Sequence, residues 1–212
     1  MGTATRKIAN AFSTSGVISS ANINNASLDN ITTISGAGDM VLVSSATASS
    51  SASIEFSLGS YKEYQFYFVD IHPSVNETSL MINFSIDNGS NYNVTKTTTR
   101  FYAYNGETSG FTLLGYLTSV DLAQSTADQE FIRGIGNDND QIGVGKLTLF
   151  NPSSTTFVKH FIGRSSTSQA SDYAEDDYLA GYANTTSALT NIRFQMSSGN
   201  IDAGTIKMFA VV

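Results

Sequence analysis

The feature that most constrains the fold is a series of short runs in which apolar and polar residues alternate, separated by turn residues. In residues 191–198, NIRFQMSS, the side chains of Ile192, Phe194 and Met196 fall on one side, as in a half-buried β-strand. Roughly eight or more such runs recur without an amphipathic helix between them. The pattern predicts an all-β fold in which two antiparallel sheets pack as a jelly-roll-like β-sandwich.

Individual runs carry further expectations. In residues 62–71, KEYQFYFVDI, apolar side chains occur at both odd and even positions. This predicts a strand covered on both faces. Turn residues at 87–91, 151–155 and 198–204 each predict a hairpin, the first because Asn-Gly readily adopts positive φ. Residues 171–183 are the run in which one helical turn is the alternative to a strand.

The composition agrees with this fold class and narrows the function. Charged residues make up only 14%, below the ~25% usual for soluble domains, and Ser, Thr and Asn take their place. These residues disfavour helix interiors, whereas the 13 Phe and 10 Tyr suit strands. A net charge of −7 argues against a nucleic-acid partner. The absence of cysteine excludes disulfides and thiolate chemistry, and no secretory signal or run of ~20 apolar residues suggests a membrane partner.

The first 38 residues differ from the rest. They are rich in Ser, Asn and Ala, and we place a boundary after Gly36-Ala37-Gly38, giving an arm of residues 1–38 and a β-sandwich domain of residues 39–212. The arm repeats Ala-Asn-Ile-Asn-Asn and Ala-Ser-Leu-Asp-Asn at 21–30. Its expected anchors are the aliphatic residues Ile18, Ile23, Leu28, Ile31 and Ile34.

Such an arm buries too little apolar surface to offset its own ordering entropy. We therefore expect it to bind copies of itself or a larger assembly, with the aliphatic residues as regularly spaced anchors. The alternative is a low-complexity linker with chance periodicity.

No catalytic residue, cofactor or metal site is expected. Gly-x-Ser-x-Gly does not occur, and both histidines, His72 and His160, are interpreted as structural. Residues 134–140 and 143–147 resemble nucleotide-binding loops but lack required positions, so both are expected to be ordinary loops. The NDND stretch at 137–140 is interpreted as turn residues in preference to a calcium site.

Two groups of residues are candidates for surface contact. The first surrounds the acidic residues 175–177, where tyrosines beside carboxylates resemble lectin-like sugar sites. A solvated loop is the preferred interpretation of this run, and a glycosidase acid pair is a further alternative. The second is a strand face rich in Tyr, Arg and Lys, typical of an interface, although its tyrosines suit a core equally. The candidates are Tyr173, Asp176, Tyr178 and Tyr182 in the first group and Lys96, Arg100, Tyr102 and Tyr104 in the second.

Several phrases resemble a family of small virion structural proteins from tailed bacteriophages, chiefly marine ones, of tail-fibre or decoration-like type. They include YKEYQFYFVDIHP, DNGSNYNVTKTTT, LFNPSSTTFVKHFI, AGYANTTSAL and SSGNIDAGTIKM, spread over roughly residues 40–210, and INNASLDNIT in the arm. The resemblance implies a place in a virus particle and no catalytic residue.

The expected function is therefore that of a non-enzymatic virion protein, assembled in the host cytoplasm, whose β-sandwich is displayed by an arm bound to capsid, tail or sister copies. By analogy with fibres and decorations we expect a homotrimer. The alternative is a carbohydrate-binding module that recognises a host surface glycan, and a depolymerase is a third possibility.

Overall fold

The computed structural model describes residues 40–108 and 110–212, and these residues form strands, turns and one short 3₁₀ turn but no α-helix. By compactness the chain divides into Met1–Asp39 and Met40–Val212, next to the predicted boundary. The elements are β1 (Met40–Thr47), β2 (Ile54–Ser57), β3 (Glu63–Pro73), β4 (Thr78–Ser85), β5 (Lys96–Gly106), β6 (Thr112–Tyr116), η2 (Thr118–Val120), β7 (Gln129–Ile135), β8 (Gly143–Phe150), β9 (Lys159–Gln169), β10 (Tyr173–Ala183), β11 (Asn191–Met196) and β12 (Ile201–Val211).

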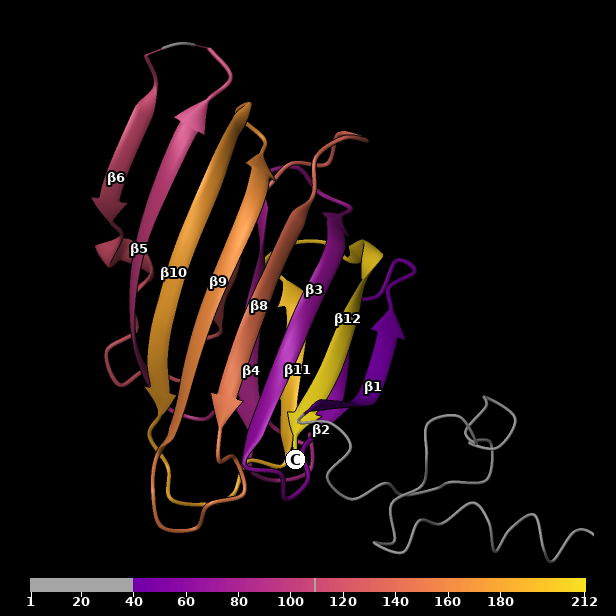
Figure 1. Ribbon diagram of the computed structural model, residues 1–212, viewed down its shortest axis with the longest axis vertical. Coiled ribbons are helices and arrows are strands. Elements are labelled where there is room, and N and C mark those ends of the chain that lie inside the picture. Colours follow the sequence, from indigo (N-terminus) through magenta and orange to yellow (C-terminus); the bar gives the residue numbers. More distant parts are fainter. Residues whose placement is uncertain (1–39, 109) are drawn as a thin grey trace, which may run out of the picture. The chain divides into compact units, whose positions relative to one another are not determined.

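The strands of Met40–Val212 lie in two antiparallel layers (Figure 1). The larger layer runs β6-β5-β10-β9-β8-β3-β12-β1 and the smaller runs β7-β4-β11-β2. One backbone pairing, between Ile135 of β7 and Gln169 of β9, joins them. The predicted all-β antiparallel sandwich is confirmed. Below, the inner face of the larger layer is the one that faces the smaller layer, and the outer face is the other.

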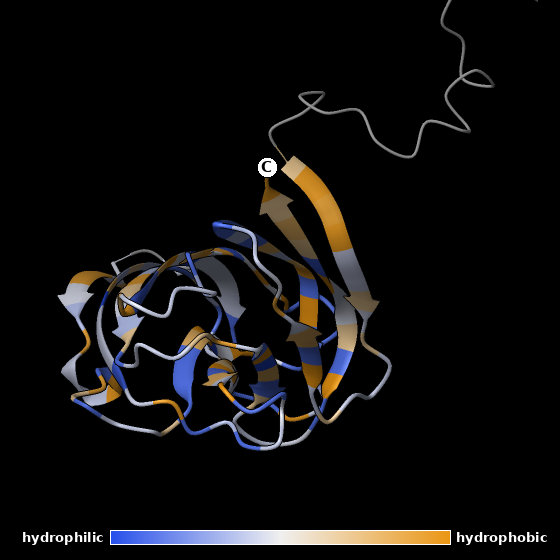
Figure 2. Cartoon of the chain, turned by 90° about the horizontal axis from the view of Figure 1, so that it is seen from below, coloured by the Kyte–Doolittle hydropathy of each residue, from blue (hydrophilic) through white to orange (hydrophobic). Residues whose placement is uncertain are grey.

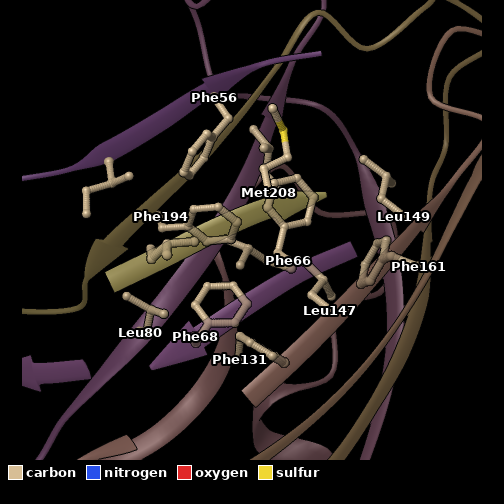
Figure 3. Packing of buried hydrophobic residues seen from close by; sticks show 14 of the residues in the cluster. Phe56, Phe66, Phe68, Leu80, Phe131, Leu147, Leu149, Phe161, Phe194 and Met208 are labelled. Atoms are coloured by element: carbon tan, nitrogen blue, oxygen red, sulfur yellow. The ribbon is translucent and has the colours of Figure 1, made fainter. Parts of the chain in front are cut away.

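The apolar core lies between the layers (Figure 3). Phe66 and Phe68 of β3 point inward and meet Phe194 of β11, with ring centroids 5.5 and 5.0 Å apart, and Phe68 also lies 5.0 Å from Phe131 of β7. Burying each such side chain contributes about 1.5–3 kcal/mol, and each aromatic pair adds about 0.5–1.5 kcal/mol. These contacts fix how the layers face each other.

Strand β3 does not have two covered faces, so that prediction is wrong. Its outer face is open, because Val69 is 40% exposed. Ile71 has the same parity as Val69 yet is fully buried, because a bulge between Phe68 and Ile71 shifts the register. Asp70 in the bulge has φ of 53°, which turns the next side chain inward.

Of the three predicted hairpins, one is confirmed. Strands β8 and β9, which flank residues 151–155, pair antiparallel from Gly143 to Leu149. The other two are wrong. Residues 87–91 connect β4 of the smaller layer to β5 of the larger, and residues 198–204 lead from β11 to β12 across the same gap, so neither pair of strands is hydrogen-bonded together. The turn chemistry is nevertheless as predicted, since Asn88 and Gly89 have φ of 58° and 83°.

One alternative left open by the sequence is excluded, and one further local prediction is wrong. Residues 173–183 form strand β10 throughout, without a helical turn, because both neighbours, β5 and β9, pair with it along its whole length. Residues 143–147, expected to be a loop, form the first part of β8.

Candidate functional site

Strand β10 divides the first group of predicted contact residues between two faces. Asp176, Tyr178 and Tyr182 lie on the outer face, whereas Tyr173 shares the inner face with Glu175 and Asp177. Because successive strand residues point to opposite sides, the acidic run cannot act as one surface loop. Glu175 and Asp177 are each 1% exposed, so only Asp176 of the three acids faces outward.

Tyr178 stands at the centre of an outer platform, by which we mean Phe101, Arg164, Asp176 and Tyr178. Phe101 of β5 lies directly opposite Tyr178, and their rings stack with centroids 4.7 Å apart and an interplanar angle of 4°. On the β9 side, the guanidinium carbon of Arg164 lies 4.9 Å from the Tyr178 ring centroid, at cation–π distance. Tyr178 is thus held between a ring and a cation.

The charged half of the outer platform is an ion pair. Arg164 donates two hydrogen bonds of 2.8 Å, one to each carboxylate oxygen of Asp176. These bonds hold the pKa of Asp176 below its usual range, and the same pairing raises the pKa of Arg164. Both side chains remain accessible and can donate to or accept from a ligand.

The outer platform continues into shallow hollows on β9 and β10. A hollow of about 150 Å³ is lined by Phe101, Ile162 and Tyr178, among others. A second, of about 390 Å³, is lined by His160, Ile162 and Tyr182. The interpretation of His160 as a satisfied structural residue is wrong, because its side chain is exposed beside Tyr182, with ring centroids 5.7 Å apart. His72 lies on β3 as expected near a strand end, with Nδ1 3.7 Å from Asp202.

The second predicted group does not form a surface stripe. Lys96 and Arg100 are fully buried, so their interpretation as contact residues is wrong. Lys96 donates from Nζ to the side-chain oxygen of Asn83 at 2.6 Å and to the carbonyl of Val94 at 2.7 Å. Burial lowers the pKa of Lys96 to about 8. Both Lys96 and Arg100 are buried because the smaller layer covers this face of β5. Alternation within β5 alone does not reveal which face is covered.

Tyr102 and Tyr104 lie further along the same inner face of β5, where they join Tyr173 and Phe111 in an aromatic cluster. The ring of Tyr104 is 4.9 Å from that of Tyr173 and 5.1 Å from that of Phe111. All three tyrosines are partly exposed, so the cluster is neither fully core nor an open platform.

Arg100 belongs to a charge cluster, defined as Arg100, Glu130, Arg133, Glu175 and Asp177. Arg100, Glu175 and Asp177 are buried, whereas Glu130 and Arg133 are partly exposed. Arg100 donates from Nε to Asp177 Oδ1 at 2.8 Å and from Nη1 to Glu130 Oε1 at 2.9 Å, and Arg133 donates to Glu175 Oε2 at 3.1 Å. Three carboxylates therefore face two guanidiniums. Burial, and after it the nearby Glu175 carboxylate, raises the pKa of Asp177 to about 7.

The charge cluster contains adjacent carboxylates but does not present them to a substrate. Glu175 also accepts a hydrogen bond of 2.7 Å from Gln169 Nε2, so each of its oxygens accepts at least one hydrogen bond within the cluster. Asp177 Oδ2 has no donor among the described residues, and a proton shared with Glu175 would satisfy it. Neither Glu175 nor Asp177 lines the hollows described above. The arrangement is that of an internal ion network.

Other sequence features take ordinary places. Residues 134 and 135 end β7, and Asp138 and Asp140 lie in the following turn beside a polar hollow of about 510 Å³. In residues 40–108 and 110–212 no group of three His, Asp or Glu side chains is placed to hold a metal ion. No helix in that same part of the chain is long and apolar enough to cross a membrane. The predicted anchors Ile18, Ile23, Leu28, Ile31 and Ile34 lie outside the described residues.

Sequence reasoning missed half of the outer platform. Phe101 and Arg164 come from two different strands, 63 positions apart by residue number (164 − 101), and only the pairing of β10 with both β5 and β9 brings them to Tyr178. The signal available in the sequence was alternation, which placed Asp176 and Tyr178 on the same parity. The sequence matches no protein-family model, and no curated protein matches it.

Proposed function

We propose that this chain is a non-enzymatic structural protein of a tailed-bacteriophage virion, either a capsid decoration or a tail or fibre appendage. Residues 1–38 anchor it to other virion proteins and to sister copies in a homotrimer, and the β-sandwich is displayed. The family resemblance supports a place in a virus particle. One feature of the fold supports the display of the β-sandwich. Met40, where the arm joins, lies on β1 at one end of the larger layer, whereas the outer platform lies on β5, β9 and β10 toward the other end.

The proposal is tested on purified particles. Mass spectrometry of virions banded in a density gradient should find the chain at a stoichiometry comparable with other structural proteins. Its absence from the particles would refute the proposal.

The role of the arm is tested separately by light scattering. The full chain should be an oligomer, and a truncated chain starting at Asp39 should be a folded monomer. If the truncated chain keeps the mass of the full oligomer, the arm is not the assembly device.

A second function, recognition of a host surface glycan, is favoured by the outer platform. An exposed aromatic ring can stack on the apolar C–H face of a sugar, and a paired arginine and carboxylate can bond its hydroxyls. Phe101 is 46% exposed, so the stack is accessible.

Binding to a glycan array and to the purified surface polysaccharide of the host tests this function. Saturable binding should be lost in Tyr178→Ala and kept in Phe157→Ala, which removes a ring that is 68% exposed in the loop before β9. Binding that survives Tyr178→Ala would argue against the outer platform as the sugar site.

A further inference from the structure

The larger layer ends in two open strand edges. Among residues 40–108 and 110–212, β1 pairs with β12 alone and β6 pairs with β5 alone. One side of each strand therefore offers backbone N–H and C=O groups that no described strand pairs. Such rows readily accept another strand. Any partner that satisfies them must itself present an extended backbone.

Neither edge carries the usual protection against pairing. Strands β1 and β6, MVLVSSAT and TLLGY, contain no charged residue and no proline. The first four residues of β1 are 41, 40, 56 and 41% exposed, and in β6 Leu113, Leu114 and Tyr116 are 43, 76 and 56% exposed. Figure 2 shows the hydrophobic start of β1. Strands that are apolar on both faces are ordinarily buried on both.

The two edges match in direction. Every neighbouring pair from β6 to β1 is antiparallel, and the seven pairings of β6-β5-β10-β9-β8-β3-β12-β1 leave β6 and β1 pointing in opposite directions, as Figure 1 shows. A β6 strand from a second copy, laid beside β1 with the layers in the same orientation, therefore continues the antiparallel sheet. Its five residues are enough to cover the four apolar residues that begin β1.

The outer faces match as well. Leu114 and Tyr116 of β6 pair with Ala103 and Phe101, which places them on the outer face. Next to β1, the same face has a hollow of about 360 Å³ lined by Met40, Tyr67, Val69, Lys207 and Phe209. In a continuous sheet, the projecting Leu114 of one copy would lie beside Met40 and this hollow of the next.

We propose that the β6 edge of one copy pairs with the β1 edge of a second copy. This deepens the proposed function, on which it rests, by adding a second contact between sister copies. The arm and the edge pairing hold the oligomer together and neither suffices alone, so removing residues 1–38 or placing a charge on β6 each gives single chains. The interface is head-to-tail, and such interfaces close into rings, a trimer among them. One contact covers both open edges, whereas pairing of β1 with β1 would leave β6 uncovered. The arm is a poorer occupant, because its longest run of large aliphatic residues is Val17-Ile18.

Disulfide trapping in the full chain tests the pairing directly, because the chain has no cysteine. Leu114→Cys is mixed, under mild oxidation, with Leu42→Cys or with Met40→Cys, all on the outer face. A disulfide requires Cα atoms about 4.4–6.8 Å apart, so a cross-linked pair is expected in one of the mixtures and in no variant alone. The proposal is overturned if neither mixture cross-links, or if a β1 variant cross-links to itself.

A second measurement uses the mass of the full chain in solution. Leu114→Lys should reduce the oligomer to the single chain of 22.6 kDa, because a charge would be buried in the sheet junction. The control Phe157→Lys places the same charge at a side chain that is about as exposed as Leu114 but lies away from both edges. It should leave the mass unchanged. An unchanged mass in Leu114→Lys overturns the edge pairing. The virion proposal would still stand if particles contain the chain, so the two failures are distinguishable.

Discussion

At the scale of single residues, the least ordinary feature is the excess carboxylate in the charge cluster. Asp177 is buried next to Glu175, and its pKa is raised to about 7 from a usual value near 3.9. The folded chain therefore binds a proton more tightly than the unfolded chain between these values. Stability is greatest where Asp177 is protonated in both states, and this residue's contribution falls as the pH rises from about 4 to about 7.

Asp177→Asn tests this linkage. The amide leaves two carboxylates facing two guanidiniums. The free energy of unfolding of the variant, relative to that of the natural chain, should therefore increase by on the order of 1–3 kcal/mol from pH 5 to pH 8. Urea unfolding at both pH values measures the difference. The matched variant Asp176→Asn should instead lose the same stability at pH 5 and at pH 8, because the pKa of Asp176 is lowered and its contribution is lost only as the pH falls below about 4. A gain that is equal at both pH values would contradict the assignment.

At the scale of elements, strand β3 depends on its bulge. Asp70 has φ of 53°, a conformation that costs residues with a Cβ about 1–2 kcal/mol and that β-branched residues tolerate least. Asp70→Val should lower the free energy of unfolding by about this amount, measured by urea titration. Asp70→Gly serves as the control and should be neutral or stabilising. Equal destabilisation by both substitutions would place the effect in the lost carboxylate instead.

The two layers approach each other closely at β9. A Cβ on Gly163 would lie 2.5 Å from Cε2 of Phe131 and 3.2 Å from Cδ1 of Leu147, so the ring would have to move. Gly163→Ala should therefore cost about 1–3 kcal/mol in thermal or urea unfolding. Ser166→Ala, on the exposed face of the same strand, should change stability by less than about 0.5 kcal/mol. A tolerated Gly163→Ala would show that the Phe131 ring can repack.

The elements also show how far sequence reasoning reaches. Alternation identified β11 with Ile192, Phe194 and Met196 inward, and all three are buried. It failed where the outcome depends on a distant partner. The turn at Asn88-Gly89 was predicted, but whether the chain returns to the same layer is decided by packing of the whole sheet. Lys96 and Arg100 followed the alternation of β5 correctly, yet which face the smaller layer covers cannot be deduced from β5 itself.

At the scale of the whole molecule, association of copies should not depend on ion pairs. Each chain carries a formal charge of −7, so copies repel, while the proposed edges are uncharged. Raising NaCl from about 0.01 M to about 1 M shortens the Debye length from about 30 Å to about 3 Å, which screens the repulsion and leaves apolar burial intact. Association of the full chain should thus be tighter in high salt, so that the oligomer persists to lower protein concentrations. Sedimentation equilibrium measures this. The Leu114→Lys variant is the control, since it should stay a single chain at both salt concentrations. An oligomer that high salt weakens would instead indicate an ionic interface, and the edge pairing of β1 with β6 would be the wrong contact.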